Sequence, residues 1–342
     1  MSGKKTQFAL LGGGLKSRSI FKEASGRFDF VALVDPTPAG NDGASEMKLP
    51  LHESLREASR KHRIDGVIVC TTAKETIAAS RAAIECQVPT LVVPSKGTSL
   101  DSSRDLVAYA KKQEVPLLVG NQRRFHPSII AAKEFIAGGG IGTVITAQST
   151  SWFPKSTAKL SDIDWTGRQG HIPLLNDLID DLDVLRYLLG EVLEISGITT
   201  RKFFGNSVPS SLGCLLRFEN DVICTLSASD EVVSQVNWYL TAGDSDAYSK
   251  TGQSCLWIGG TGGTLSIPDL AFWSYGDADP SWDSRLQADQ IKLDSMTSSV
   301  VAELLDFESV IQGKKTPGCS AEDALNSMLL VERLYDSLTR LV

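Results

Sequence analysis

Hydrophobic and polar positions alternate regularly over the first 120 residues. Short apolar runs predict buried strands, and the longer segments between them have apolar positions at helical spacing. The predicted strands are 7–12, 28–35, 66–71, 89–93 and 115–119, the predicted helices are 17–25, 74–86 and 101–113, and 52–62 is amphipathic. Strands that alternate with helices in this way indicate an α/β fold with a doubly wound parallel sheet.

After residue 124 the pattern changes to alternating strands with few helices. The predicted helices are 127–137, 173–189, 296–312 and 320–340, and the predicted strands are 144–152, 194–203, 212–218, 223–229, 235–242, 255–260, 263–267, 271–275 and 290–294. Asn220-Asp221 predicts the turn of a hairpin. We therefore expect an α/β domain over 1–124 and an α+β domain over 125–342, with a large, mostly antiparallel open sheet. One face of this sheet would pack on helices, and the other would face solvent or another subunit.

Charge and composition exclude several classes of function. A net charge of −7 and a pI of about 5.3 argue against nucleic acid as a partner. No window approaches 18 consecutive apolar residues, so no membrane span is expected. The six cysteines are scattered and form no CxxC pair, which favours reduced thiols in a cytoplasmic protein over disulfides or a zinc site.

A glycine cluster follows the first predicted strand. In Gly12-Gly13-Gly14-Leu15-Lys16-Ser17, Gly12 permits a tight turn and Gly14 allows a pyrophosphate to approach the start of a helix. Asp35 ends the second strand, where a carboxylate can accept hydrogen bonds from the adenosine ribose and repel a 2′-phosphate, so NAD is favoured over NADP. The alternative is a glycine turn in a fold that binds no nucleotide. Lys16 and Arg18 could soften the preference for NAD or be solvated charges at the helix start.

Five stretches resemble the glucose–fructose oxidoreductase / inositol dehydrogenase / MocA (Gfo/Idh/MocA) family. They are the glycine turn with Asp35, the strand end 65–72, the loop 93–97, GNQRRFHP at 120–127 and PLLNDLIDDLDVLRYLLG at 173–190. The resemblance implies an N-terminal Rossmann domain that binds NAD(P) and a C-terminal sheet domain, with the active site between them. It further implies NAD(P)-dependent hydride transfer at a carbinol of a sugar, cyclitol or related polyol. It also implies homodimers or homotetramers that pack through the open sheet face.

The resemblance assigns further site residues. Lys96 aligns with the active-site lysine that contacts the reacting oxygen, and the alternative is a surface lysine in a loop. Asn176 and Asp180 share one helix face, which in the family looks at the nicotinamide. Asp183 aligns with a structural aspartate. The expected cofactor-binding residues are Gly12, Gly13, Gly14, Leu15, Lys16, Asp35, Thr71, Thr72, Lys96 and Gln122.

Three positions depart from the family pattern. Asp180 replaces a histidine, Ser95 replaces a glutamate, and Gly97 replaces a proline. Aspartate is a poorer base than histidine at neutral pH because its ordinary pKa is about 3.9. Asp180 could therefore accept a proton through Lys96, His171 could serve instead, or the chemistry could have changed.

Other polar residues remain open to two interpretations. Trp165 resembles a pocket-lining residue, and Arg168 and Arg124 could bind the substrate, although Arg124 could equally be structural. His171 could be a solvated loop histidine. Asp177 and Asp181 could be solvated helix charges; four aspartates within seven residues do not by themselves indicate a metal, and none is expected.

The favoured hypothesis is an NAD-dependent oxidoreductase acting on a sugar, cyclitol or related cyclic metabolite. Two alternatives stay open. One is a redox-neutral enzyme that uses NAD transiently, such as an epimerase, lyase or glycosidase. The other is a non-catalytic relative that binds nucleotide.

Overall fold

The chain folds into two compact units in the computed structural model. The structure describes residues 5–95, 97–155, 173–200, 210–244, 248–276, 278, 281, 283–293 and 297–339. One unit consists of Met1–Phe125 with Thr297–Asn326, and the other of His126–Met296 with Ser327–Val342. The predicted domain boundary at 124 lies next to Phe125, where the first segment of the first unit ends. The sequence pattern did not indicate that the chain returns to the first unit at 297–326.

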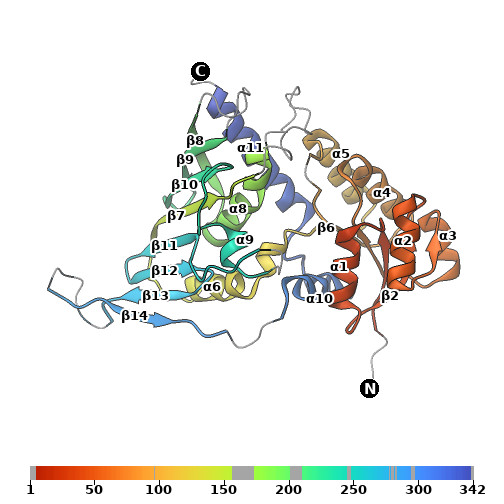
Figure 1. Ribbon diagram of the computed structural model, residues 1–342, viewed down its shortest axis with the longest axis horizontal. Coiled ribbons are helices and arrows are strands. Elements are labelled where there is room, and N and C mark those ends of the chain that lie inside the picture. Colours follow the sequence, from red (N-terminus) through yellow and green to blue (C-terminus); the bar gives the residue numbers. More distant parts are fainter. Residues whose placement is uncertain are drawn as a thin grey trace. The chain divides into compact units, whose positions relative to one another are not determined.

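The first unit contains a six-stranded parallel sheet (Figure 1). Its strands are β1 (Gln7–Leu11), β2 (Asp29–Val34), β3 (Leu51–His52), β4 (Gly66–Val69), β5 (Thr90–Val92) and β6 (Leu117–Val119). They lie in the order β3-β2-β1-β4-β5-β6, with every pair parallel. This is the strand order of a dinucleotide-binding Rossmann sheet, so the predicted fold class is confirmed.

Helices cover both faces of this sheet. They are α1 (Leu15–Ala24), α2 (Pro38–Met47), α3 (Leu55–Lys61), α4 (Ala73–Glu85), α5 (Leu100–Lys112) and α10 (Ser299–Ile311), with a short 3₁₀ helix η1 (Gln122–Phe125). Residues of α1, α2 and α10 share one hydrophobic core with the sheet, and residues of α3, α4 and α5 share the other. α10 belongs here because Phe307 is fully buried and stacks on Phe8 of β1, with ring centroids 5.5 Å apart.

The region 38–62 shows where the hydrophobic pattern was insufficient. α2 was not predicted, because its polar, glycine-containing sequence has no apolar stripe; Pro38 starts it. Gly43 permits close packing, since a Cβ there would lie 2.7 Å from the carbonyl oxygen of Gly13. The amphipathic segment 52–62 divides into the end of β3 and α3, which Ser54 caps.

The second unit contains an eight-stranded sheet. Its strands are β7 (Val144–Trp152), β8 (Val192–Thr199), β9 (Ser211–Phe218), β10 (Ile223–Ser229), β11 (Leu256–Gly260), β12 (Gly263–Ile267), β13 (Ala271–Ser274) and β14 (Gln287–Gln290). They lie in the order β14-β13-β12-β11-β7-β10-β9-β8. Among the described strands of this second sheet, only β7 and β10 pair in parallel, and the other pairs are antiparallel. The prediction of a large, mostly antiparallel sheet is confirmed.

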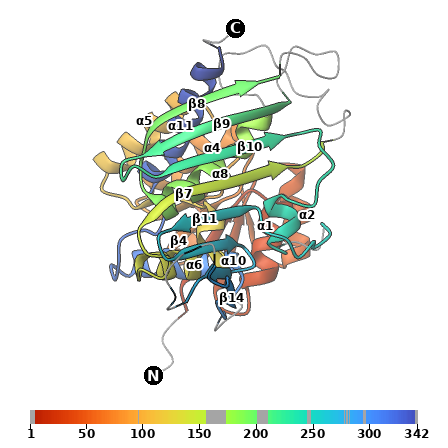
Figure 2. The same cartoon turned by 90° about the vertical axis from the view of Figure 1, so that its left-hand side faces the viewer.

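Helices of the second unit lie on one face of its sheet (Figure 2). They are α6 (Pro127–Ala137), α8 (Pro173–Leu189), α9 (Trp238–Thr241) and α11 (Ala321–Thr339), the last of which begins in the first unit. Leucines of α8 and α11, including Leu182 and Leu334, are fully buried against Leu216 and Ile258 of the sheet. The other face points toward the viewer in Figure 2.

The predicted hairpin is confirmed, and two predicted strands are wrong. Asp221 has a positive φ of 62° in the turn between β9 and β10. Residues 235–242 contain helix α9 instead of a strand, because the side chain of Asn237 accepts a hydrogen bond from Tyr239 N at 2.9 Å and caps the helix. The last strand, β14, ends at Gln290, where the predicted strand 290–294 was expected to begin. Ile291 and Leu293, whose apolar side chains suggested that strand, follow β14 and pack against the core.

None of the helices that the structure describes has an apolar stretch sufficient to cross a bilayer.

Candidate functional site

The glycine turn between β1 and α1 has the backbone that its sequence predicts. Gly12 has a φ of +96°, and a Cβ on it would lie 2.7 Å from the carbonyl oxygen of Cys70. Gly14 is the N-cap of α1, with no side-chain cap and with open space where a Cβ would be. Leu15, in the first turn of α1, is 83% exposed. Ser17 is buried and donates a hydrogen bond to Gly12 O, so it fills the place of the usual third glycine.

Asp35 lies beside this turn at the carboxyl end of β2. Its carboxylate accepts hydrogen bonds from Gly13 N at 2.7 Å (Oδ2) and from Thr37 N at 2.9 Å (Oδ1), and the residue is 8% exposed. Each oxygen keeps a second lone pair for a further donor. The uncapped helix start, the open space at Gly14 and the fixed carboxylate are the groups that a dinucleotide needs, so these residues fit one.

The two cations that flank the turn are bound by protein groups. Lys16 Nζ donates to Pro94 O at 2.5 Å. Arg18 Nη1 lies 2.8 Å from Glu46 Oε2, and its Nε donates to Gly13 O at 3.1 Å. Both side chains therefore help to hold the loops around the turn.

The predicted nicotinamide-side residues follow β4 and β6 at the carboxyl edge of the same sheet. Thr72 starts α4 and hydrogen-bonds through its hydroxyl to Glu75 Oε2 at 2.8 Å, while Thr71 Oγ1 lies 3.3 Å from Thr76 Oγ1. Gln122 is exposed at the start of η1. Asn121 beside it is buried, and its Nδ2 donor has no partner among the residues that the structure describes.

Several expected site residues lie outside the described residues: Lys96, Trp165, Arg168 and His171. Gly97, which replaces the family's proline, has a φ of +87°. Proline holds φ near −65°, so it could not adopt this backbone, whereas glycine adopts it without strain. The departure at 97 therefore accompanies a different turn after the predicted active-site lysine.

Arg124 is buried in the first unit. Its Nη1 donates to Gly318 O at 3.2 Å and lies 3.9 Å from Asp323 Oδ2. These contacts attach η1 to the segment that follows α10 and favour the structural interpretation. A contact with substrate stays a prediction.

Helix α8 carries the aspartate-rich stretch of the second unit. Asn176 and Asp180 are both half-buried on one face of the helix. Asp183 is 1% exposed and accepts a hydrogen bond from Ser327 Oγ at 2.7 Å. Ser327 also accepts from Arg186 Nη1 at 2.7 Å, so this end of α8 is anchored to α11, as expected for a structural aspartate.

A buried ion triad at the head of α8 was missed by the sequence analysis. Lys155 Nζ lies 2.6 Å from Asp177 Oδ2 and 2.8 Å from Asp230 Oδ1. Burial lowers the pKa of Lys155, and Asp230 opposes that shift. The interpretation of Asp177 as a solvated helix charge is wrong, because its side chain is only 18% exposed and paired.

The triad depends on strand pairing that one sequence does not reveal. β7 and β10 are parallel neighbours, and the pairing continues beyond their ends, where Lys155 N donates to Asp230 O at 2.8 Å. α8 then brings Asp177 to the same end of the two strands. Nothing in the spacing of these three residues indicates that they meet.

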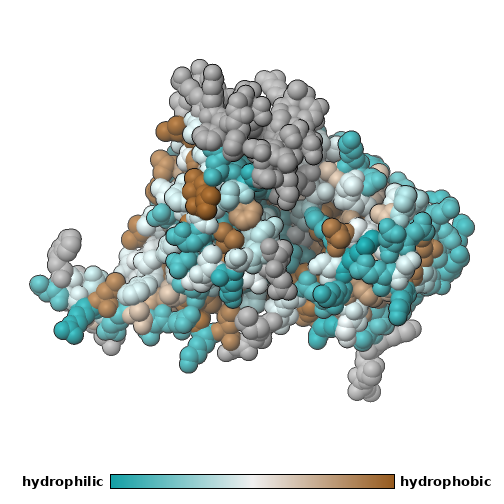
Figure 3. Space-filling model, viewed as in Figure 1, coloured by the Kyte–Doolittle hydropathy of each residue, from teal (hydrophilic) through white to brown (hydrophobic). Residues whose placement is uncertain are grey.

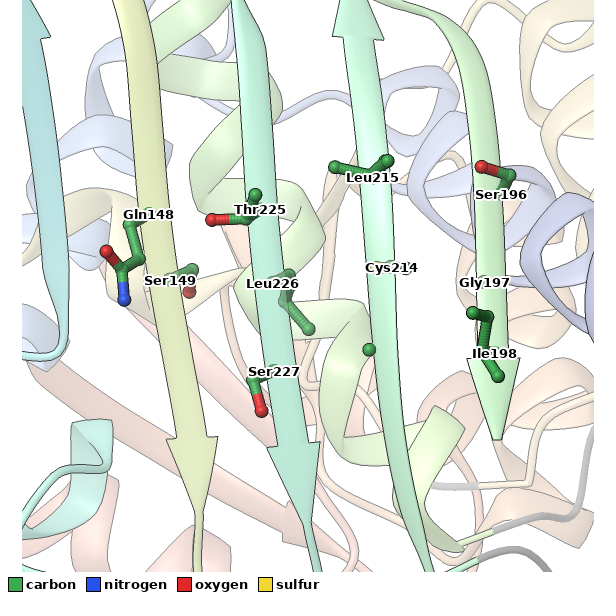
Figure 4. A pocket seen from close by; sticks show the side chains of 11 residues that line it. Gln148, Ser149, Ser196, Gly197, Ile198, Cys214, Leu215, Thr225, Leu226 and Ser227 are labelled. Atoms are coloured by element: carbon green, nitrogen blue, oxygen red, sulfur yellow. The ribbon is translucent and has the colours of Figure 1, made fainter. Parts of the chain in front are cut away.

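A shallow hollow of about 570 Å³ lies in the sheet of the second unit (Figure 4). Gly213 leaves open space in its floor, and Ile198, Leu215, Thr225 and Gln148 come from four adjacent strands around it. None of the predicted site residues lines this hollow.

Comparison with known proteins defines the class. Residues 129–266 match the model of the GFO/IDH/MocA C-terminal domain. The predicted family resemblance is thereby confirmed for this region, which is similar to the C-terminal domain of the Gfo/Idh/MocA proteins and follows a Rossmann sheet.

Individual relatives are more distant. The chain is 30% identical to inositol 2-dehydrogenase of Rhizobium meliloti (strain 1021) over 199 residues, which are 54% of this chain and 55% of that enzyme. The chain thus spans about half the length of this relative.

Two solved structures share the whole fold. An oxidoreductase from Agrobacterium radiobacter in complex with NAD+, L-tartaric acid and magnesium has a TM-score of 0.78 at 18% identity, over 99% of this chain and 98% of that one. A putative NADPH-dependent oxidoreductase from Desulfitobacterium hafniense also has a TM-score of 0.78, at 15% identity over 98% and 96%. At these identities the likeness concerns the fold alone.

Proposed function

We propose that this protein is an NAD-dependent oxidoreductase that acts on a carbinol or ketone of a sugar, cyclitol or related cyclic metabolite. The observation that carries the proposal is the glycine turn at the uncapped start of α1, with Asp35 fixed beside it. The inositol 2-dehydrogenase relative supports the substrate class. Bound NAD would accept hydride from the substrate carbon, or NADH would return it.

The residues of the first unit would bind and orient the dinucleotide. The N–H groups at the start of α1 would hold the pyrophosphate, and the carboxylate of Asp35 would accept hydrogen bonds from the adenosine ribose. Because solved relatives include both NAD+ and NADPH-dependent proteins, the choice between cofactors rests on Asp35. A carboxylate at this place repels a 2′-phosphate.

The family resemblance supplies the proposed proton chemistry. Lys96 would polarise the reacting oxygen, and Asp180 or His171 would relay its proton. An aspartate in place of histidine at 180 also keeps the two alternatives open, a redox-neutral enzyme that uses NAD transiently and a nucleotide-binding relative without turnover.

The proposal is tested first by titrating the purified protein with NADH and NADPH and following the fluorescence of the bound nucleotide. We expect saturable binding of NADH, tighter than that of NADPH, and a reversed preference in Asp35→Ser, which removes the repelling charge. Gly14→Val, which puts a branched side chain in the open space at the helix start, should abolish binding of both. Failure of the unchanged protein to bind either nucleotide would refute the proposal.

Turnover then separates the three functions. A panel of polyols and cyclic ketones should give net NADH formation or consumption that is lost in Lys96→Ala. Conversion of substrate without net NADH would indicate the redox-neutral alternative. Binding without any turnover, unchanged by Asp180→His, would indicate the non-catalytic one.

A further inference from the structure

Helix α10 carries a carboxyl group, that of Glu303, into the interior of the first unit. The residue is 6% exposed, and its Oε1 has no hydrogen-bond partner among the residues that the structure describes. A Cβ on Gly120 would lie only 2.8 Å from Oε1. The carboxyl group therefore lies directly against the backbone at the end of β6.

Glu303 lies close to the two segments that carry the residues expected on the nicotinamide side, one after β4 and one after β6. Gly120 follows β6 and leads into Gln122. Cys70 follows β4 and leads into Thr71. Burial raises the pKa of the Cys70 thiol, and the charge of Glu303 adds a smaller increase. The carboxyl group is thus close to the carboxyl edge of the sheet at two strands, on the side away from Asp35.

Burial has the largest influence on the pKa of Glu303, and several charged groups lie on the elements around it. The elements packed against it carry Asp306 and Glu308 on α10, Arg123 and Arg124 on η1, and Lys16, Arg18, Lys22 and Glu23 on α1. Arg124, Lys16 and Arg18 are bound by Gly318, Pro94 and Glu46, as described above, and Lys315 Nζ lies 2.5 Å from Asp306 Oδ1. Burial, and then the negative charge of Asp306, raise the pKa of Glu303 to about 8.

We propose that Glu303 couples the release of one proton to the charge of the nicotinamide ring, holding NAD+ more tightly when ionised and NADH equally well in both protonation states. The inference rests on the proposed function, since it requires a dinucleotide in the first unit. The physical reason is Coulombic, because a carboxylate removed from water attracts the cationic ring of NAD+ and gains nothing from the neutral ring of NADH.

The sign of the pH dependence follows from this coupling. Below about pH 8 the nucleotide-free protein holds the proton, and NAD+ favours its release, so NAD+ affinity should rise with pH. Above that pH the proton has already left and the affinity should level off. NADH affinity should not change over the same range, because its ring is neutral. A difference of one pKa unit between the free and NAD+-bound forms corresponds to about a tenfold change in affinity.

The experiment measures dissociation constants of NAD+ and NADH from pH 6.5 to 9.5 by titration calorimetry, for the unchanged protein, Glu303→Gln and Glu308→Gln. Glu308 is the matched control, since it is on the same helix and accepts a hydrogen bond from Thr6. We expect the ratio of NAD+ to NADH affinity to rise about tenfold or more with pH in the unchanged protein and in Glu308→Gln. In Glu303→Gln the ratio should not change with pH.

Infrared spectroscopy of the nucleotide-free protein supplies a second measurement. A carbonyl band of a protonated carboxylic acid should be present at pH 7, disappear with a midpoint near pH 8, and be missing in Glu303→Gln. Absence of this band from the unchanged protein would overturn the inference even if the variant did not fold. An affinity ratio with the same pH dependence in Glu303→Gln would overturn it too, while leaving the proposed function intact. If the unchanged protein bound neither NAD+ nor NADH, the inference on Glu303 and the proposed function would both be refuted.

Discussion

Glu303 is a residue whose burial has a consequence for stability as well as for binding. Its pKa is raised from an ordinary value of 4.5 to about 8. An unfolded chain loses this proton near pH 4.5, whereas the folded chain keeps it until about pH 8. The free energy of unfolding therefore falls as the pH rises between these two values and is independent of this group above them.

Replacement of Glu303 by glutamine should remove this pH dependence. We expect Glu303→Gln to gain stability relative to the unchanged protein as the pH rises from 5 to 8, by about 1.4 kcal/mol per pH unit at most. Urea unfolding at pH 5, 6.5 and 8 measures the difference. A difference that stays constant with pH would show that the carboxyl group ionises normally.

The role of a residue could be predicted where its partners are near in the sequence or where a known fold fixes their position. Asp35 and Gly12 were found because a glycine turn and a strand-ending carboxylate have a fixed spacing in a Rossmann unit. Glu303 and Lys155 were not, because burial and partners brought from distant elements decide their chemistry. Gly97 was noted as a departure, but only the positive φ explains it.

At the scale of elements, the ion triad at the head of α8 fixes three segments to one another. It joins the end of β7, the end of β10 and the first turns of the helix that carries Asn176 and Asp180. The described hydrophobic contacts of α8 orient its apolar face, and the triad adds a polar attachment at the end of the helix where Asn176 lies.

Lys155→Met should therefore destabilise the second unit by about 3 kcal/mol, because it leaves two largely buried carboxylates without their cation. Denaturant unfolding gives the value. Arg217→Met is the matched control: Arg217 pairs with Glu194 and Asp221 on the surface, where 39% of its side chain is exposed, and should cost less than about 1 kcal/mol. Equal losses in the two variants would contradict a special role for the triad.

Elements with regular apolar spacing were predicted well, including the five longer strands of the first sheet and helix α8. The failures have specific causes. α2 lacks an apolar stripe, α9 forms because Asn237 caps it, and the parallel pairing of β7 with β10 joins strands that are far apart in sequence.

At the scale of the whole molecule, the open face of the second sheet is unusually apolar. Its strands expose Ile198 (75%), Ile145 (55%), Leu215 (53%), Leu193 (47%), Trp273 (45%) and Ile223 (41%). Hydrophobic side chains are visible along that side of the second unit, at the left of Figure 3, whereas most of the first unit's visible surface is hydrophilic. Large exposed apolar patches mark interaction surfaces.

We propose that this face joins copies of the chain into a homodimer or homotetramer. Leu215→Glu, in the middle of the face, should lower the mass in solution to that of a monomer, because it buries a charge in the interface. Light scattering during gel filtration measures this mass. Leu286→Glu is the control, since Leu286 is 54% exposed but precedes β14 at the far edge. A monomeric unchanged protein would refute the proposal.

The discontinuous first unit has a consequence for biosynthesis. Its sheet is finished at residue 119, yet the helix that covers Phe8 and holds Glu303 begins only at residue 299, 180 residues later. At ribosomal rates of about 5 to 20 residues per second, the nascent sheet waits roughly 10 to 40 seconds with one face incompletely covered. Most of the second unit emerges during that interval, but its core also needs α11, which is made after α10. Neither unit should therefore become fully resistant to protease on the ribosome until both helices have emerged.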